Sequence, residues 1–146
     1  MEQIRKPLEN YREIDAFKIY VSDSGLLCAK NSLAKNLTAE DVLYMTDELN
    51  DFKGGMTENH VNIQLSINGY QTYYWESERG AEIDFIIQRE GEIIPIEVKS
   101  ADNTKAKSLK VYMDTYRPAY AIKLSAKNFG YEDAKKTVPL YAAFCI

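Results

Sequence analysis

Apolar and polar residues alternate along residues 82–88 and 93–100, on either side of a polar turn at 89–92. Successive side chains of a strand point to opposite faces of its sheet, so this pattern predicts two strands joined in a β-hairpin. The first strand has its apolar residues at a period of two: Ile83, Phe85 and Ile87. The second strand continues the pattern with Ile94, Ile96 and Val98. Each strand is therefore expected to have one apolar face.

The charged residues of this hairpin are expected to meet on the other face. If the turn is centred within 89–92, Asp84 lies opposite Glu97, and Glu82 lies opposite Lys99. Directly opposed carboxylates on paired strands have Cβ atoms about 4.5–5.5 Å apart and repel each other. A hard divalent cation, which prefers oxygen ligands, would relieve that repulsion. Lys99 reaches the same place, so the pattern indicates a metal site with a cation beside it, suited to a phosphate-type substrate.

A simpler interpretation of the hairpin also exists. Charged residues that alternate with Ile and Val are typical of any half-exposed strand. Pro95 adds a further complication, because proline cannot donate to a strand ladder and marks an edge position or a bulge. A bulge at Pro95 would shift the pairing by one residue and separate the carboxylates of Asp84 and Glu97.

Outside the hairpin, the pattern predicts helices on both sides. Phe17–Ala29 is expected to lead into a helix after a cap at Ser22, Asp23 or Ser24. Residues 38–50 predict a helix that stops before the Gly54–Gly55 pair. Another helix is predicted from Thr57 to Asn68–Gly69, with four residues on one face: Glu58, Val61, Asn62 and Leu65. Glu58 would lie near the N-terminal end of this helix, where its negative charge could simply complement the helix dipole.

The remaining pattern completes a mixed α/β domain. Strands are expected at 71–75, 119–125 and 138–144 in addition to the hairpin, with a helix at 103–116 that Pro118 terminates. This order predicts an N-terminal linker and helical extension over residues 1–50, followed by one α/β domain over residues 51–146.

Composition narrows the class of protein. The chain has 146 residues, a net charge of −4, and two cysteines, Cys28 and Cys145, without metal-ligand spacing. No apolar run is long enough to cross a membrane, and no signal-peptide pattern opens the chain. We therefore expect a cytoplasmic protein with reduced thiols and no membrane partner. The sequence contains no G-x-x-x-x-G-K-[ST] motif, so no ATP site is expected in this chain.

The charge is unevenly distributed. Residues 1–98 contain nine Lys/Arg and eighteen Asp/Glu, whereas residues 99–146 contain nine Lys/Arg and four Asp/Glu. A basic C-terminal third beside a carboxylate cluster could hold a phosphate backbone. The alternative is that these lysines form only a solvated surface.

The order helix, three strands, helix, strand, together with D-x12-E-x-K at 84–99, resembles the PD-(D/E)XK nuclease superfamily with its restriction-endonuclease-like fold. Further motifs narrow the resemblance to the C-terminal nuclease-like domain of a group of prokaryotic AAA+ ATPases. They are F-K-I-Y-V-S-D-S-G-L-L at 17–27, G-G-M-T-E-N-H-V at 54–61, Y-Y-W at 73–75, A-E-I-D-F at 81–85, P-I-E-V-K-S at 95–100 and V-P-L-Y at 138–141. The resemblance runs from about Pro7 to the end of the chain and implies that an ATPase module precedes it in a longer protein.

The resemblance also implies roles for individual residues. Asp84 and Glu97 would ligate Mg²⁺ or Mn²⁺, with the Val98 carbonyl as a third oxygen. Lys99 would orient the attacking water or stabilise charge in the transition state, and Glu58 would complete the acidic cluster. The implied reaction is metal-dependent hydrolysis of phosphodiester bonds in nucleic acid.

Two other functions remain open from the sequence. The domain could be a non-catalytic module that docks DNA or a partner protein and regulates the linked ATPase, which suits the acidic N-terminal two-thirds of the chain. It could also self-associate through a tyrosine-rich surface. Metal binding that depends on Asp84 and Glu97 would distinguish the nuclease from both.

Overall fold

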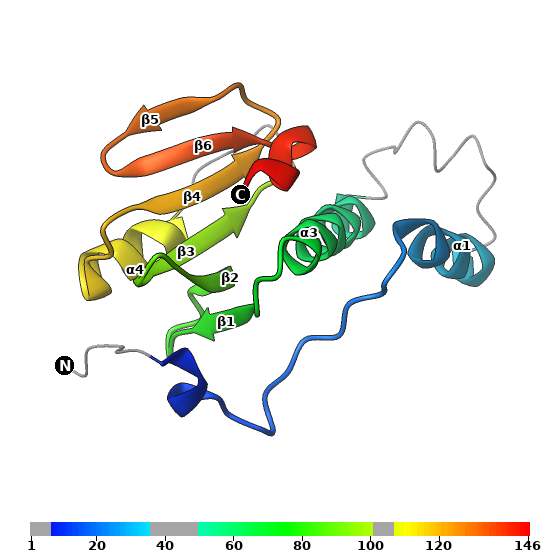
Figure 1. Ribbon diagram of the computed structural model, residues 1–146. Helices are drawn as coiled ribbons and strands as arrows, with labels where there is room; N and C mark the ends of the chain where they lie inside the picture. Colours follow the sequence, from blue (N-terminus) through cyan, green and yellow to red (C-terminus); the bar gives the residue numbers. More distant parts are fainter. Residues whose placement is uncertain (1–6, 36–49, 101–106) are drawn as a thin grey trace.

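A six-stranded mixed sheet forms the centre of the protein, in the order β1-β2-β3-β4-β6-β5 (Figure 1). The structure is a computed structural model, which describes residues 7–35, 50–100 and 107–146. The strands are β1 (Tyr73–Glu76), β2 (Glu82–Arg89), β3 (Glu92–Val98), β4 (Ala121–Ser125), β5 (Gly130–Glu132) and β6 (Lys135–Pro139). The predicted α/β class is confirmed at this level.

Strand directions divide the sheet into two halves. β1, β2 and β3 form an antiparallel meander, whereas β4 pairs in parallel with both β3 and β6. Helix α4 (Lys107–Tyr116) makes the crossover from β3 to β4 that a parallel pair requires. α4 ends before Pro118, as predicted; the expected start of this helix, at 103–106, lies outside the described residues.

The β2–β3 hairpin has the predicted register. Phe85 pairs with Ile96 and Ile87 with Ile94, as that register requires, and beyond these pairs Val98 N donates to the Asp84 side chain. The turn residues Glu90 and Gly91 have φ values of 51° and 82°, as a type I′ turn requires. The pairing runs through Pro95 without a shift, so the bulge considered there is absent from these pairs.

A bulge occurs instead on the β1 side of β2. Tyr73 pairs with Ile86 but Trp75 pairs with Ile83, so the two residues Asp84 and Phe85 oppose one residue of β1. The extra residue reverses the alternation of side chains. Ile83 consequently packs with Ile86 on the face opposite Phe85, and the prediction that Ile83 shares a face with Phe85 and Ile87 is wrong.

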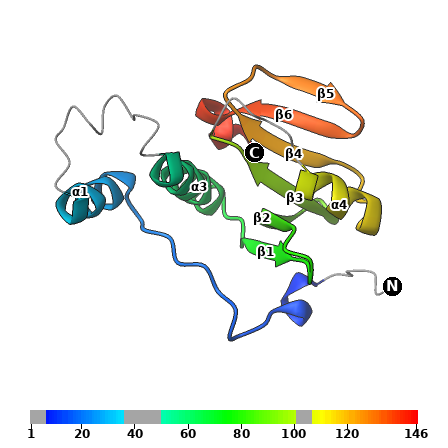
Figure 2. The same ribbon diagram turned by 180° about the vertical axis from the view of Figure 1, so that it is seen from behind.

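The two faces of the sheet carry separate cores. Helix α4 lies behind the sheet in Figure 1 and in front of it in Figure 2, which shows the molecule from behind. Helix α3 (Asn50–Ile67) and the 3₁₀ segment η3 (Leu140–Cys145) cover one face. Its buried residues are Val61, Leu65, Phe85, Ile87, Ile94, Ile96, Ile122, Leu124, Ala143 and Ile146. α4 covers the other face. The buried residues there are Leu8, Ile83, Ile86, Leu109, Tyr112 and Ala121, of which Leu109 and Tyr112 belong to α4 itself.

Helix α3 passes through Gly54 and Gly55, where the sequence predicted a break. A glycine inside a helix costs only about 1 kcal/mol relative to alanine, and burial of Phe52 ahead of the pair offsets it. Glu58 therefore lies well inside α3, and the dipole role considered for it is wrong. The helix predicted over 38–50 falls largely on residues 36–49, outside the described part of the chain.

The C-terminal end of α3 was predicted correctly. Gly69 has a φ of 80°, Tyr70 N donates to Leu65 O and Gly69 N donates to Ser66 O. These two bonds form a Schellman motif, which satisfies carbonyls that the last helical turn leaves unpaired.

The end of the chain differs from its prediction. The strand expected at 138–144 is replaced by β6, which ends at Pro139, and by η3. β5 was not predicted at all, because its three exposed residues, Gly130–Glu132, have no apolar alternation. An edge strand on the outside of a sheet needs no buried face of its own.

An extended segment in the N-terminal part of the chain connects a short 3₁₀ helix to the first α-helix. It leaves η1 (Leu8–Tyr11) near β1 and reaches helix α1 (Ser24–Lys35), which lies beside α3 (Figure 1). Asp23 caps α1, as predicted, by accepting from Leu26 N at 2.9 Å. None of the described helices combines the length and the apolar character that a bilayer span requires.

Candidate functional site

Asp84 lies at the β2 bulge, half-buried at the base of a cleft of about 450 Å³. Its Oδ2 accepts a hydrogen bond from Val98 N at 2.7 Å. The pKa of Asp84 is raised to about 6, mainly by burial and also by the nearby Glu58 carboxylate. The Val98 amide and the cations of Lys18 and Lys99 act in the opposite direction. A carboxylate in this position gains from any additional positive charge.

Glu97 faces α4 at the end of β3 and is only 1% exposed. Its Oε2 accepts from Leu109 N in the first turn of α4 at 3.1 Å, and its Oε1 pairs with Lys99 Nζ at 2.6 Å. Lys99 is held in turn through its own backbone N–H, which donates to Leu124 O at 2.9 Å. Lys99, which the sequence predicted to lie near the carboxylates, is thus in direct contact with Glu97.

Glu58 approaches the same region from α3. Its Oε1 accepts from Tyr20 Oη at 2.5 Å and from Lys18 Nζ at 3.0 Å. Lys18 also forms an ion pair with Glu82. Burial by itself lowers the pKa of Lys18, but its hydrogen bonds to Glu82 and Glu58 reverse this effect and the pKa is raised. Burial, followed by the Glu58 carboxylate, raises the pKa of Tyr20, so its hydroxyl stays a donor.

The predicted residues thus form two adjoining groups. Asp84 is electrostatically coupled to Glu58 and reaches the Val98 amide, which lies between Glu97 and Lys99 along β3. The Glu97 carboxylate is bound to Leu109 and Lys99 instead. In the described part of the chain, no three Asp, Glu, His or Cys side chains are already gathered for metal ligation. Carboxylate oxygens have further lone pairs, so a hydrogen-bonded Glu97 still has acceptor capacity.

The N-terminal segment forms one wall of the cleft above Asp84. Tyr11, Phe17, Lys18 and Tyr20 line it opposite Tyr74 and Trp75 of β1. Phe17 and Ile19 are 70% and 83% exposed, whereas the alternating Lys18 and Tyr20 are partly buried. The sequence predicted a boundary at residue 50 between an N-terminal extension and an α/β domain. Residues from both of these parts line the cleft.

Sequence reasoning missed this contribution. It assigned no role to Lys18, Tyr20 or Asn59, although two of the motifs that carried the resemblance contain them. Asn59 is 2% exposed; its Oδ1 accepts from Val21 N at 2.8 Å and its Nδ2 donates to Val21 O at 3.1 Å. The available signal was the alternation of Phe17, Lys18, Ile19 and Tyr20, which indicates an extended segment with one polar face.

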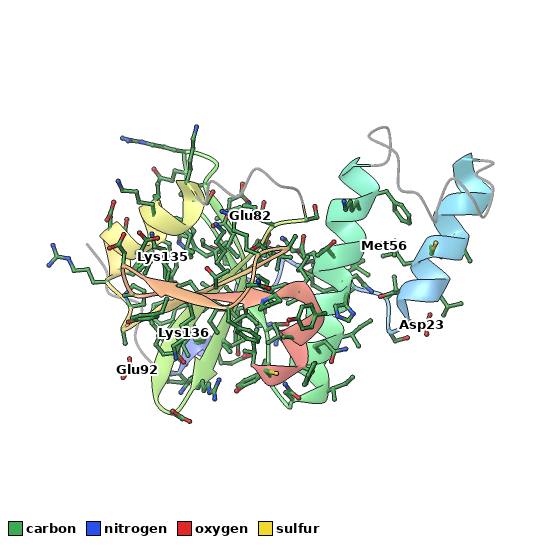
Figure 3. All side chains as sticks on the ribbon, turned by 90° about the horizontal axis from the view of Figure 1, so that it is seen from above. Asp23, Met56, Glu82, Glu92, Lys135 and Lys136 are labelled. Carbon is green, nitrogen blue, oxygen red and sulfur yellow. The ribbon has the colours of Figure 1, made fainter. Side chains whose placement is uncertain are left out.

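Lysines collect on the α4 side of the sheet next to Glu97. Lys123 of β4 pairs in register with Glu97. Partial burial lowers the pKa of Lys123, and nearby Lys127, Lys135 and Lys99 lower it further. Figure 3 shows Lys135 and Lys136 on opposite sides of β6, with Lys135 on the side of α4. Lys136 instead lies over the ring of Tyr120, 3.8 Å from its centroid.

A family model described as "Domain of unknown function (DUF4143)" matches residues 53–143. The matched range contains Glu58, Asp84, Glu97 and Lys99, whereas Lys18 and Tyr20 precede it. No curated protein and no solved structure matches the chain significantly.

Proposed function

The chain belongs to the DUF4143 family, and from its site we propose that it is a nuclease-like module that binds a divalent metal and hydrolyses phosphodiester bonds of nucleic acid. The order α3, β1–β3, α4, β4 supports a restriction-endonuclease-like core, because it is the order of helices and strands that the resemblance implied. An upstream ATPase in a longer protein is part of the same proposal.

One observation carries the proposal. The bulge in β2 turns the Asp84 carboxylate onto the Val98 amide, between Glu97 and Lys99, with Glu58 close enough to perturb its pKa. Asp84, Glu97 and Lys99 therefore lie around the end of one hairpin, and Glu58 approaches Asp84 from α3. Because the pKa of Asp84 is about 6, its carboxylate is mostly ionised at pH 7–8 and ready to bind a cation.

The donor set fits Mg²⁺ or Mn²⁺, which prefer oxygen ligands. Asp84, Glu97 and the Val98 carbonyl would hold the ion, and Glu58 would lie beside it. When bound, the ion would polarise the phosphate and lower the pKa of a water molecule. Glu97 orients the Lys99 ammonium through their 2.6 Å ion pair, so that Lys99 can stabilise negative charge developing on the phosphate.

The lysine surface supports nucleic acid as the substrate. The pKa of Lys123 is lowered first by burial and then by the charges of three nearby lysines, Lys127, Lys135 and Lys99, so these side chains are close enough to repel it. A polyanionic backbone would relieve this repulsion and release counterions on binding. The surface begins at the candidate site, because Lys99 belongs to both.

A second candidate is a non-catalytic docking module that regulates the linked ATPase. The contacts of Glu97 favour it, because both its oxygens are already bonded within the fold, as in a purely structural ion pair. The exposed Ile14, Phe17 and Ile19 would then offer the docking surface. Self-association through these residues belongs to the same class and predicts a dimer whether or not metal is present.

Calorimetric titration of Mn²⁺ into the full chain tests the proposal. We expect wild type to bind and Asp84→Asn to lose binding, whereas Asp114→Asn on the exposed side of α4 should bind like wild type. Cleavage of end-labelled single-stranded and duplex DNA and RNA would then be measured with Mg²⁺ and Mn²⁺. Absence of metal binding by wild type would remove the nuclease proposal and leave the docking module.

A further inference from the structure

Lys18 is the charged residue at the site that the sequence did not anticipate. Its ammonium contacts Glu58 Oε1 at 3.0 Å, forms an ion pair with Glu82 and lies 5.4 Å from the centroid of the Tyr74 ring. Lys18 also lines the same cleft as the Asp84 carboxylate. Three carboxylates on β2 and α3, which we call the acidic cluster, thus share this one lysine: Glu58, Glu82 and Asp84.

The position of Lys18 is fixed by its neighbours in the chain. Tyr20 donates to the same Glu58 oxygen that Lys18 contacts. The buried Asn59 bonds both the N–H and the carbonyl of Val21, and so replaces the pairing that a strand would give. Residues 18–21 are therefore attached to α3 by side-chain contacts rather than as a strand of the sheet.

We propose that Lys18 is a built-in counter-ion that sets the affinity of the site for divalent metal, by occupying the acidic cluster and being displaced from it when metal binds at Asp84. The inference rests on the metal site proposed above. It adds a residue outside the matched family range and gives the N-terminal segment a part in the site.

Electrostatics and flexibility support this role. Without Lys18 the cluster has three negative charges to attract a cation, whereas with it one of them is neutralised. A divalent ion beside Asp84 would also be repelled by the Lys18 ammonium in the same cleft. Lysine has a long, flexible stem with a compact charge, so it can leave the cluster while Tyr20 and Val21 remain bound. Glu82, one of its two acidic partners, is half exposed and offers a path outward.

Substitutions that separate charge from shape test the proposal. Lys18→Met removes the charge and keeps the stem, and we expect it to tighten Mn²⁺ binding by about tenfold or more. Lys18→Arg keeps the charge and should bind within about threefold of wild type. Tyr20→Phe removes a hydrogen bond to Glu58 without changing the charge, so it should not tighten binding. Lys18→Gln, which keeps a donor towards Glu58, provides a second neutral variant if Lys18→Met does not fold.

The readout is the dissociation constant for Mn²⁺ measured by calorimetry on the full chain, with circular dichroism to verify folding. Tighter binding by the neutral variants, lost again when Asp84→Asn is added, would support the counter-ion role. Equal or weaker binding by folded Lys18→Met and Lys18→Gln, while wild type still binds, would overturn that role and leave the metal site intact. No binding by wild type or by the neutral variants would overturn both the metal site and this inference.

Discussion

The two sides of the candidate site are held together in different ways. On one side, Glu97 of β3 and Lys99 just after this strand are two residues apart and are fixed by Leu109 and Leu124, on the next helix and strand. On the other, Glu58 is held by Lys18 and Tyr20, which lie 40 and 38 residues away along the chain. The first side is local and buried, whereas the second depends on a long-range contact with an extended segment. We therefore expect the first to determine stability and the second to determine accessibility.

Glu97→Ala tests the side of the site formed by Glu97 and Lys99 and is expected to have the largest effect on stability. It leaves the buried Leu109 N–H without an acceptor and the partly exposed Lys99 ammonium without its ion pair, which together cost about 3 kcal/mol of unfolding free energy. Urea unfolding would measure the loss. Glu92→Ala, on an exposed residue of the same strand, is the control and should change the free energy of unfolding by less than about 0.5 kcal/mol. If both variants lowered the free energy of unfolding by the same small amount, the contacts of Glu97 would not be needed for stability.

Asp84→Asn is expected to change how the free energy of unfolding depends on pH. The pKa of Asp84 is raised from 3.8 to about 6 in the folded protein. Between these values the folded protein keeps a proton that the unfolded chain has released, so this residue makes the free energy of unfolding fall as pH rises through that window. Without metal, Asp84→Asn should be more stable than wild type by up to about 3 kcal/mol above pH 7 and equal to it below pH 4.

Chemical unfolding of metal-free protein at several pH values would measure this effect, with Asp114→Asn as the exposed control. A stability difference that does not change between pH 4 and pH 8 would contradict the raised pKa of Asp84.

Asn59→Ala tests the long-range side. It removes the two hydrogen bonds to Val21, with an expected loss of about 2 kcal/mol. Because these bonds attach the N-terminal segment, hydrogen exchange and limited proteolysis should increase within residues 12–23 more than in β2 and β3. Asn128→Ala, at an exposed position, serves as the matched control. Unchanged protection of residues 12–23 would mean that the segment is held by other contacts.

Neutralising the lysine surface should have the smallest effect. Lys127→Gln and Lys135→Gln are each expected to weaken nucleic-acid binding several-fold and to reduce the salt dependence by about one phosphate contact. Lys136→Gln lies on the other side of β6 and should leave binding unchanged. Fluorescence anisotropy at several salt concentrations provides the measurement. Equal losses from Lys135→Gln and Lys136→Gln would argue against a binding face on the α4 side.

The sequence by itself determined the elements with strong local signals. Alternation on either side of residues 89–92 defined the β2–β3 hairpin and its register from Phe85 to Arg89. Turn and cap residues such as Gly69 and Asp23 correctly marked helix ends. These features succeed because strand period and turn chemistry act within a few residues, where a single sequence contains all the information.

Only the tertiary structure decided the rest. The bulge at Asp84 arises from pairing between β1 and β2, and it moves Ile83 to the other face of the sheet. Burial of Phe52 offsets the cost of glycines that locally favour a break in α3. The approach of Lys18 to Glu58 links residues that no local periodicity connects, because it depends on where the folded sheet and α3 bring the extended segment. The acidic residues were therefore predictable from the sequence, whereas their counter-ion was not.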